Sequence, residues 1–297
     1  MKKLLLASAL ALTTTVAVAD PIYLDVGFDF GGNANFAVDG NTTGWVDQLT
    51  HLYQSESNIV DLDDSFDFVN ASSLLTDGDT ITTNGGFSDF DSLSQNLITG
   101  LNPSSNPFGG PSDNAIGDDW GLTFTINNLV GTIAGGANQF LNYTSGAINF
   151  FYYDTSMGAT TDFIELFTIN VTGSGLIASG SFIAGTLSDF GTDMVGDGAD
   201  AVLAGNVFNS QLGGFKDYAD SQTSPDLAIN SLIDYNTENL QASDITLNGT
   251  DGDGHALVTI NGQHDGSMTF SVPEPTSLAI LGLGLLGFAA SSRKKSA

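Results

Sequence analysis

Alternation of apolar and polar side chains is the feature that most constrains the fold of this chain. The two clearest runs lie at residues 120–127 and 167–172, and their alternating apolar members are Leu122, Phe124, Ile126, Phe167, Ile169 and Val171. A period of two is typical of a strand with one buried face. Extended stretches with helical periodicity are missing, and turn-forming residues separate the short runs. The pattern predicts an all-β fold, an antiparallel β-sandwich or jelly-roll-like single domain with long Asp- and Gly-rich loops.

Two hairpins can be predicted around these runs. Residues 140–143 and 147–153 flank Thr144-Ser145-Gly146, a turn-like tripeptide, and predict the first. Residues 256–260 and 267–272 predict the second, which leads into the C-terminal segment. The chain has no cysteine, so a packed core must stabilise these strands.

The remaining stretches give weaker patterns. Residues 23–30 and 244–247 predict strands, whereas residues 45–53 predict a short helix because three apolar residues would share one face. The stretches 55–119 and 189–226 are rich in Asp and Gly, and the first also contains a cluster of prolines. Such composition predicts loops, with short strands interspersed in the first stretch.

The first nineteen residues have the organisation of a secretory signal peptide. Two lysines precede the apolar stretch 4–12, and the small residues Ala17 and Ala19 supply the cleavage pattern. We therefore expect export through the Sec machinery and removal of residues 1–19. Asp20 would then be the first residue of the mature chain.

Residues 272–297 have the organisation of a second targeting segment. Val272-Pro273-Glu274-Pro275 is followed by an apolar run at 278–290 and by the basic residues Arg293, Lys294 and Lys295. A helix over the run, at about 1.5 Å per residue, would measure about 20 Å, which is shorter than the roughly 30 Å hydrocarbon core. The basic tip would stay on the cytoplasmic side. We therefore expect a short apolar transmembrane helix that serves as a transient inner-membrane intermediate, with the body of the protein outside.

The order of these elements resembles the PEP-CTERM sorting signal of Gram-negative bacteria that make exopolysaccharide. The resemblance covers residues 272–297. It implies recognition by an exosortase in the inner membrane, cleavage near Pro273, Glu274 and Pro275, and release to the cell surface or extracellular matrix. The alternative is a plain C-terminal membrane anchor.

Positive charge is almost confined to the two terminal segments. Between Asp20 and Ser271 the sequence has one basic residue, Lys216, against 33 acidic residues, which gives a net charge of −32. Nucleic acids, anionic lipids and phosphorylated substrates need Lys or Arg as counter-charges. The composition therefore argues against nucleic acids, anionic lipids and phosphorylated substrates as partners.

Many of the aspartates lie beside Gly or other Asp, a placement that suits calcium, which prefers carboxylate and carbonyl oxygens. None of the groups completes an EF-hand loop. The same aspartates can also form turns and keep an exported surface soluble. Calcium therefore stays a possible cofactor, and its candidate ligands are Asp61, Asp63, Asp64 and Asp67; Asp77 and Asp79; Asp189, Asp193, Asp197 and Asp200; and Asp251 and Asp253.

Catalytic signatures are weak. A Gly-x-Ser-x-Gly motif is missing, and the absence of cysteine excludes a thiol nucleophile. Glycoside hydrolysis needs two carboxylates, for which Glu56, Glu165 and Glu238 are candidates. The three histidines favour surface or turn positions; they are His51, His255 and His264. We therefore expect a protein without catalytic residues.

A second resemblance concerns the body. The stretch 120–132, then Tyr143-Thr144-Ser145-Gly146 and Phe150-Phe151-Tyr152-Tyr153, is similar to the flocculation-associated subgroup of PEP-CTERM proteins. That resemblance implies a role in holding cells together in an exopolysaccharide matrix or biofilm. Exposed aromatic residues would stack on sugar rings, and the candidates are Trp45, Trp120, Tyr152 and Tyr153. The alternatives are a calcium-dependent carbohydrate-binding module and a secreted glycan hydrolase.

Overall fold

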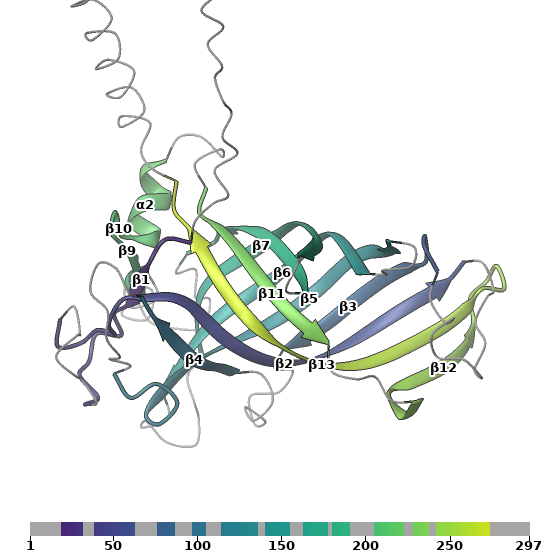
Figure 1. Ribbon diagram of the computed structural model, residues 1–297, viewed down its shortest axis with the longest axis horizontal. Helices are drawn as coiled ribbons and strands as arrows, with labels where there is room; N and C mark the ends of the chain where they lie inside the picture. Colours follow the sequence, from purple (N-terminus) through teal and green to yellow (C-terminus); the bar gives the residue numbers. More distant parts are fainter. Residues whose placement is uncertain are drawn as a thin grey trace, which may run out of the picture.

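The computed structural model (Figure 1) describes residues 19–31, 39–62, 76–86, 97–104, 114–135, 140–154, 163–177, 180–190, 205–222, 228–237 and 242–273. A short helix, α2 (Phe215–Ser221), and a 3₁₀ turn (Ala242–Asp244) accompany the strands. The strands are β1 (Ile22–Leu24), β2 (Val46–Asp61), β3 (Thr80–Gly86), β4 (Leu97–Pro103), β5 (Trp120–Ala134), β6 (Phe140–Asp154), β7 (Phe163–Ile177), β8 (Gly180–Ser188), β9 (Phe208–Ser210), β10 (Gly213–Gly214), β11 (Asn230–Thr237), β12 (Ile245–Thr250) and β13 (Ala256–Ser271).

All of these strands belong to one antiparallel sheet, which closes on itself where β13 pairs with β2. Its order is β10-β9-β1-β2-β3-β5-β6-β7-β8-β11-β13-β12, with β4 attached to β2. β13 also pairs with β2, from Ala256 opposite Asp61 to Met268 opposite Leu49. In Figure 1, β2, β11 and β13 pass in front of β5, β6 and β7. The predicted all-β, antiparallel, sandwich-like domain is confirmed, and the closure through β2 and β13 is a feature that the sequence did not indicate.

Aromatic side chains fill the space that the sheet encloses. Phe124, Phe150 and Phe167 come from β5, β6 and β7, and their rings stack with centroids 5.6 and 5.2 Å apart. Phe208 meets the ring of Phe167 edge-on at 5.0 Å, and Phe270 of β13 lies 5.5 Å from Phe208. All five side chains are buried. The inward faces predicted for residues 120–127 and 167–172 are therefore confirmed.

The turns predicted at residues 144–146 and 261–266 are wrong, because both stretches lie inside long strands. β6 runs through Thr144-Ser145-Gly146, and β13 runs without a break through residues 261–266. In β5 and β6 the register shifts between Asn127 and Val130, which marks a β-bulge. A bulge changes the side-chain alternation in the same way that a turn does, so the sequence pattern does not separate the two.

The helix predicted at residues 45–53 is also wrong, because this stretch begins the long strand β2. Its inward positions include His51, Ser55 and Ser57, which are buried although they are polar. Polar residues on the buried face hide the period of two. The expected loops at 55–119 include β3 and β4, and those at 189–226 include β9, β10 and α2.

Gly146 provides a direct test of the β5–β6 bulge. Its φ of +132° disfavours any side chain, and an added Cβ would lie 2.7 Å from both Leu129 Cα and Asn128 O. We expect Gly146→Ala to lower the free energy of unfolding by about 2–4 kcal/mol, through backbone strain and overpacking.

Urea unfolding of the purified chain would measure this loss. Gly173→Ala is the matched control, because an added Cβ there meets nothing within 4 Å. The control should stay within about 1 kcal/mol of the unchanged protein. Equal losses at the two glycines would contradict the role assigned to Gly146.

Candidate functional site

Many of the residues predicted from the sequence to carry function lie outside the described part of the chain. They are Ala17, Glu274, Pro275, Arg293, Lys294 and Lys295 of the two targeting segments, and Asp63, Asp64, Asp67, Asp193, Asp197 and Asp200 of the calcium candidates. The short apolar helix expected at 278–290 and Glu238 also lie there. The described residues do include Ala19, Pro273 and Asp61, which can be placed in the fold.

The predicted start of the mature chain lies against the beginning of the predicted sorting signal. Asp20 N donates a hydrogen bond to Phe270 O at 2.9 Å, and Val272 N donates to the Asp20 carboxylate at 2.7 Å. The Tyr218 hydroxyl of α2 donates to the carbonyl oxygen of Pro273. Figure 1 shows α2 beside the end of β13. The fold therefore brings together two segments that are more than 250 residues apart in the sequence.

Among the aspartates of residues 61–79 that the structure describes, Asp79 has a structural role. Asp61 is the buried last residue of β2, and Asp79 is buried just before β3. The Asp79 carboxylate accepts hydrogen bonds from Leu62 N at 3.0 Å and from Thr76 N at 2.8 Å. It therefore stabilises the two chain segments that enter and leave the stretch between these strands. Asp77, its predicted partner in a calcium group, is exposed.

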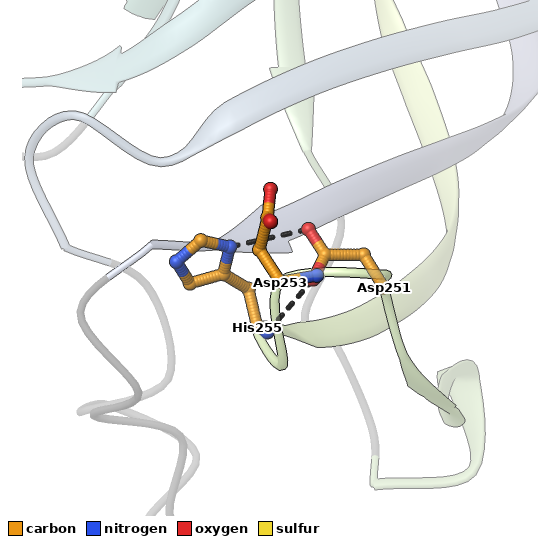
Figure 2. A group of neighbouring side chains, drawn as sticks. All are labelled: Asp251, Asp253 and His255. Atoms are coloured by element: carbon orange, nitrogen blue, oxygen red, sulfur yellow. Dashed lines mark hydrogen bonds and ion pairs between the residues drawn. The ribbon is translucent and has the colours of Figure 1, made fainter.

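One group of side chains within the described residues has the spacing of a metal site (Figure 2). Asp251, Asp253 and His255 lie in the turn between β12 and β13, and their ligand atoms are all within 4.8 Å of one another. Asp251 Oδ1 accepts hydrogen bonds from the backbone N–H groups of Asp253 and His255, both at 2.9 Å. Asp251 Oδ2 lies 3.1 Å from His255 Nδ1.

These contacts show what the turn does. Desolvation works against the charged form of Asp251, but the hydrogen bonds from His255 and Asp253 outweigh it and hold the pKa of that carboxyl below its ordinary value. Both Asp251 oxygens are thus already used to close the turn. A histidine nitrogen in the group also suits a transition metal better than calcium. Sequence spacing identified Asp251 and Asp253, whereas His255 joins them only because the turn folds back.

Two histidines lie inside the closed sheet, contrary to the prediction of surface or turn positions. His51 of β2 and His264 of β13 are 2% and 5% exposed. His264 Nε2 shares a hydrogen bond of 2.7 Å with Ser55 Oγ, and its ring stacks on Tyr53 at 4.6 Å. His51 Nε2 donates to Asp234 O at 3.1 Å. We call these residues, His51, Tyr53, Ser55 and His264, the interior histidine cluster.

Ser55 and His264 of the interior histidine cluster are paired as a nucleophile and a base would be, but both are buried in the core. Ser55 is 6% exposed, and the ring of His51 meets that of Phe124 edge-on at 5.9 Å. A neighbouring chain of hydrogen bonds joins Ser57 to Thr83 at 2.8 Å and Thr83 to Tyr143 at 2.7 Å. Burial raises the pKa of Tyr143 to about 12. The Ser55–His264 pair and the Ser57–Thr83–Tyr143 chain are each joined by hydrogen bonds inside the sheet, and they help to fix its packing.

The four aromatic residues considered for sugar stacking belong to the core. Trp120 is fully buried, and Trp45, Tyr152 and Tyr153 are each less than 9% exposed. The ring of Trp120 stacks on that of Tyr152 at 5.9 Å, and its indole N–H donates to Asn114 O at 2.6 Å. None of these four rings therefore presents a free face to a ligand.

A row of hydrogen-bonded polar side chains crosses the outer face of β5, β6 and β7. Asn127 Nδ2 donates to Asn149 Oδ1 at 2.8 Å. Asn149 Nδ2 donates to Glu165 Oε1 at 2.8 Å and to Thr168 Oγ1 at 3.1 Å. We call these four residues the β5–β7 ladder. Of these four residues, the sequence identified only Glu165 as a candidate. The strand register that brings the four side chains together cannot be read from the sequence of any one strand.

A second row crosses β12, β13 and β2. Asn248 Nδ2 donates to Thr259 Oγ1 at 2.6 Å, and Thr259 Oγ1 donates to Asn58 Oδ1, also at 2.6 Å. Asn58 Nδ2 then donates to Glu56 Oε1 at 3.2 Å. We call these residues the β12–β2 ladder. Each ladder ends at one of the glutamates that the sequence offered as a catalytic carboxylate.

Comparison with known proteins identifies the C-terminal segment. The family model of the PEP-CTERM protein-sorting motif matches residues 271–294, which confirms the resemblance seen in the sequence. The motif marks an exported protein that passes a membrane step and is recognised by an exosortase. No curated protein and no solved structure shows significant similarity to the chain. Among the helices of the described residues, none has the length and apolar character needed to cross a membrane.

Acid should destabilise this protein through the interior histidine cluster. Burial lowers the pKa of both His51 and His264 from 6.5 to about 4. At His264, the nearby His51 ring lowers the pKa further. The unfolded chain takes up protons below about pH 6.5, whereas the folded chain does so only near pH 4. Stability is therefore complete above pH 6.5 and is lost as the pH falls towards 4, by on the order of 3 kcal/mol for one histidine.

Urea unfolding at a series of pH values between 7 and 4 would measure this loss. His264→Gln should flatten the dependence, although it also removes the hydrogen bond to Ser55. His255→Gln is the matched control, because His255 lies in the β12–β13 turn. The control should keep the steep decline. If all three proteins lose stability in parallel, the acid sensitivity does not come from the cluster.

Proposed function

We propose that this protein, which carries the PEP-CTERM sorting motif at residues 271–294, is a non-enzymatic cell-surface or extracellular-matrix protein that associates with exopolysaccharide and supports cell aggregation and biofilm. The motif accounts for export and for recognition by an exosortase. The finer part of the proposal depends on one observation, the β5–β7 ladder on the outer face of the sheet.

The ladder has the chemistry that a polyhydroxylated polymer needs. Its amide and hydroxyl groups both donate and accept hydrogen bonds, and they are held in place by one another. Because neighbouring strands lie about 4.8 Å apart, the groups are spaced at intervals comparable with the length of a sugar ring. Asn127 is exposed, Asn149 and Glu165 are half-buried, and Thr168 is buried. A glycan laid across the strands would therefore meet several polar groups at once.

Half-buried aromatic rings adjoin the ladder on the same face. Phe151 lies opposite Glu165 in the pairing of β6 with β7. Phe163 is half-buried, and its ring lies 5.8 Å from that of Tyr153. Tyr153 in turn covers Gly121, where an added Cβ would lie 2.2 Å from its hydroxyl. Apolar ring surface beside polar groups favours the binding of sugars, which have an apolar face of their own.

The charge of the body narrows the class of polysaccharide. With one lysine between Asp20 and Ser271, the protein has almost no cation to pair with an acidic glycan. A neutral or amino-bearing polymer is therefore the natural ligand for direct association. Acidic polymers would need a divalent cation as a bridge, and that is how a calcium-dependent carbohydrate-binding module would work.

A non-enzymatic role agrees with the environment of the residues that offered catalysis. Ser55 and His264 are paired in the core, where a polymeric substrate has no path to them. Glu165 accepts hydrogen bonds from Asn149 and from Thr168, the latter at 3.3 Å. Glu56 and Glu165 lie in different ladders, on β2 and β7. The outward groups thus support binding better than bond cleavage.

The β5–β7 ladder can be tested by binding to purified exopolysaccharide from the producing strain. Asn149→Ala removes the residue that joins the three strands and should weaken binding about fivefold, the ratio given by one ordinary hydrogen bond. Asn58→Ala is the matched control, because it makes the same chemical change in the β12–β2 ladder. The control should bind normally, and both variants should keep their unfolding midpoint.

The same assay distinguishes the alternatives. Binding that disappears with EDTA and returns with calcium would favour the calcium-dependent module. Release of soluble sugar from the polymer would indicate a hydrolase. Unchanged binding by Asn149→Ala, or an equal loss in Asn58→Ala, would remove the ladder from the proposal.

The biological role can be tested by deleting the gene and measuring how fast cells settle. We expect slower settling and thinner biofilm in the deletion strain, with recovery when the full chain is supplied. A shortened chain that ends at Ser271 lacks the sorting signal. When it is supplied to the deletion strain, it should not restore settling after the cells have been separated from their culture medium. Normal flocculation in the deletion strain would contradict the proposed role.

A further inference from the structure

The folded body holds the chain up to the first residue of the Pro-Glu-Pro sequence. β13 ends at Ser271, which pairs with Asn230 of β11. Val272 follows, is 4% exposed, and donates its N–H to the Asp20 carboxylate at 2.7 Å. Pro273 is held through its carbonyl oxygen, which accepts a hydrogen bond from Tyr218. We call the residues that make these two contacts, Asp20 and Tyr218, the terminal latch.

The terminal latch is anchored in the core. Phe215 of α2 is 1% exposed, and its ring lies 5.6 Å from Phe208 and 5.5 Å from Phe270. Phe270 O accepts the hydrogen bond from Asp20 N at 2.9 Å. Tyr218 is one turn beyond Phe215 on the same helix and is itself 6% exposed. The hydroxyl that binds Pro273 is therefore fixed by packing beneath it.

We propose that the terminal latch sets the upstream limit of C-terminal processing, so that cleavage falls beyond the Pro273–Glu274 bond and the released protein keeps Val272 and Pro273 in its fold. Asp20 and Tyr218 are positioning residues in this step. The inference depends on the exosortase step of the proposed function.

The physical reason is the protection that a fold gives to its own backbone. A protease binds its substrate as an extended segment, so a bonded and buried segment must first open. Residues 271–273 would have to break the pairing with Asn230 and both latch contacts. On the other side, four residues, 274–277, separate Pro273 from the apolar run that begins at Leu278. The sequence between the latch and the apolar run is therefore short, and the fold determines where it begins.

A proline-specific endoprotease acting on the purified full chain can test the latch without an exosortase. It has two adjacent targets, the bonds after Pro273 and after Pro275. We expect slow cleavage after Pro273 and faster cleavage after Pro275. Tyr218→Phe removes only the hydroxyl and should speed cleavage after Pro273 about fivefold, whereas the rate after Pro275 changes little. Asp20→Asn, which weakens the contact with Val272 N, should act in the same direction.

Two variants serve as matched controls. Tyr23→Phe makes the same change in a tyrosine of β1, and Asp217→Asn makes the same change in α2, outside the latch. Both should leave the two rates as they are. Unfolding midpoints of all variants would show that faster cleavage does not come from a general loss of stability. Equal rates after Pro273 in the unchanged chain and in Tyr218→Phe would overturn the inference.

Mass spectrometry of the processed protein from cells that contain the exosortase tests the same limit in its biological setting. C-termini beyond Pro273 support the latch, and additional ends at or before Pro273 in Tyr218→Phe support it further. A C-terminus at or before Pro273 as the main product of the unchanged protein would overturn this inference and leave the proposed function standing. A chain that stays uncut would overturn both.

Discussion

The pairing of β2 with β13 is the interaction on which the rest of this structure depends. It joins Leu49 to Met268 and Asp61 to Ala256, residues about two hundred positions apart in the sequence. Ordering so long a loop costs conformational entropy, which a ladder of backbone hydrogen bonds and the burial of aromatic rings on its inner side must offset. Once β13 is in place, the sheet has an inside and an outside. Within the described residues, the interior histidine cluster lies inside, the β5–β7 ladder lies outside, and the terminal latch lies where the two ends of the body meet.

The inside explains the behaviour of the polar core. His51 and His264 come from the two strands that close the sheet, and they stay neutral because burial lowers their pKa. Ser55 and Tyr53 complete their surroundings. The outside has the opposite character, since carboxylates, amides and hydroxyls face water with almost no positive charge among them. The same pairing thus separates a neutral polar interior from an acidic outer surface.

The closure also explains why the two processing segments are neighbours. β1 and β13 lie on the same side of β2, where Ile22 pairs with Val46 and Met268 with Leu49. The start and the end of the body therefore reach the same end of the sheet. Asp20 can then bind Val272 directly, and α2 can reach Pro273. Removal of residues 1–19 and of the residues that follow Pro273 would leave the partners of both contacts in the chain.

The sequence predicted some strands well and others badly, for physical reasons that individual residues show. Leu122, Phe124 and Ile126 revealed their strand because each inward position is apolar. β2 was mistaken for a helix because its inward positions include His51 and Ser55, so that its alternation is hidden. The sequence Thr144-Ser145-Gly146 is typical of a turn, but the positive φ of Gly146 accommodates a bulge instead. A local pattern carries no information about which distant residue will be opposite.

The sequence by itself determined the route of the protein and the sign of its charge. The sorting motif is a linear signal that an enzyme reads in order, so its residues need no fold to be recognised. The same is true of a net charge, which is a sum over residues wherever they lie. Only the tertiary structure decided that His51 meets Tyr53, that Asn127 reaches Asn149, and that Tyr218 holds Pro273. These contacts depend on strand register and sheet closure, which are properties of the whole chain at once.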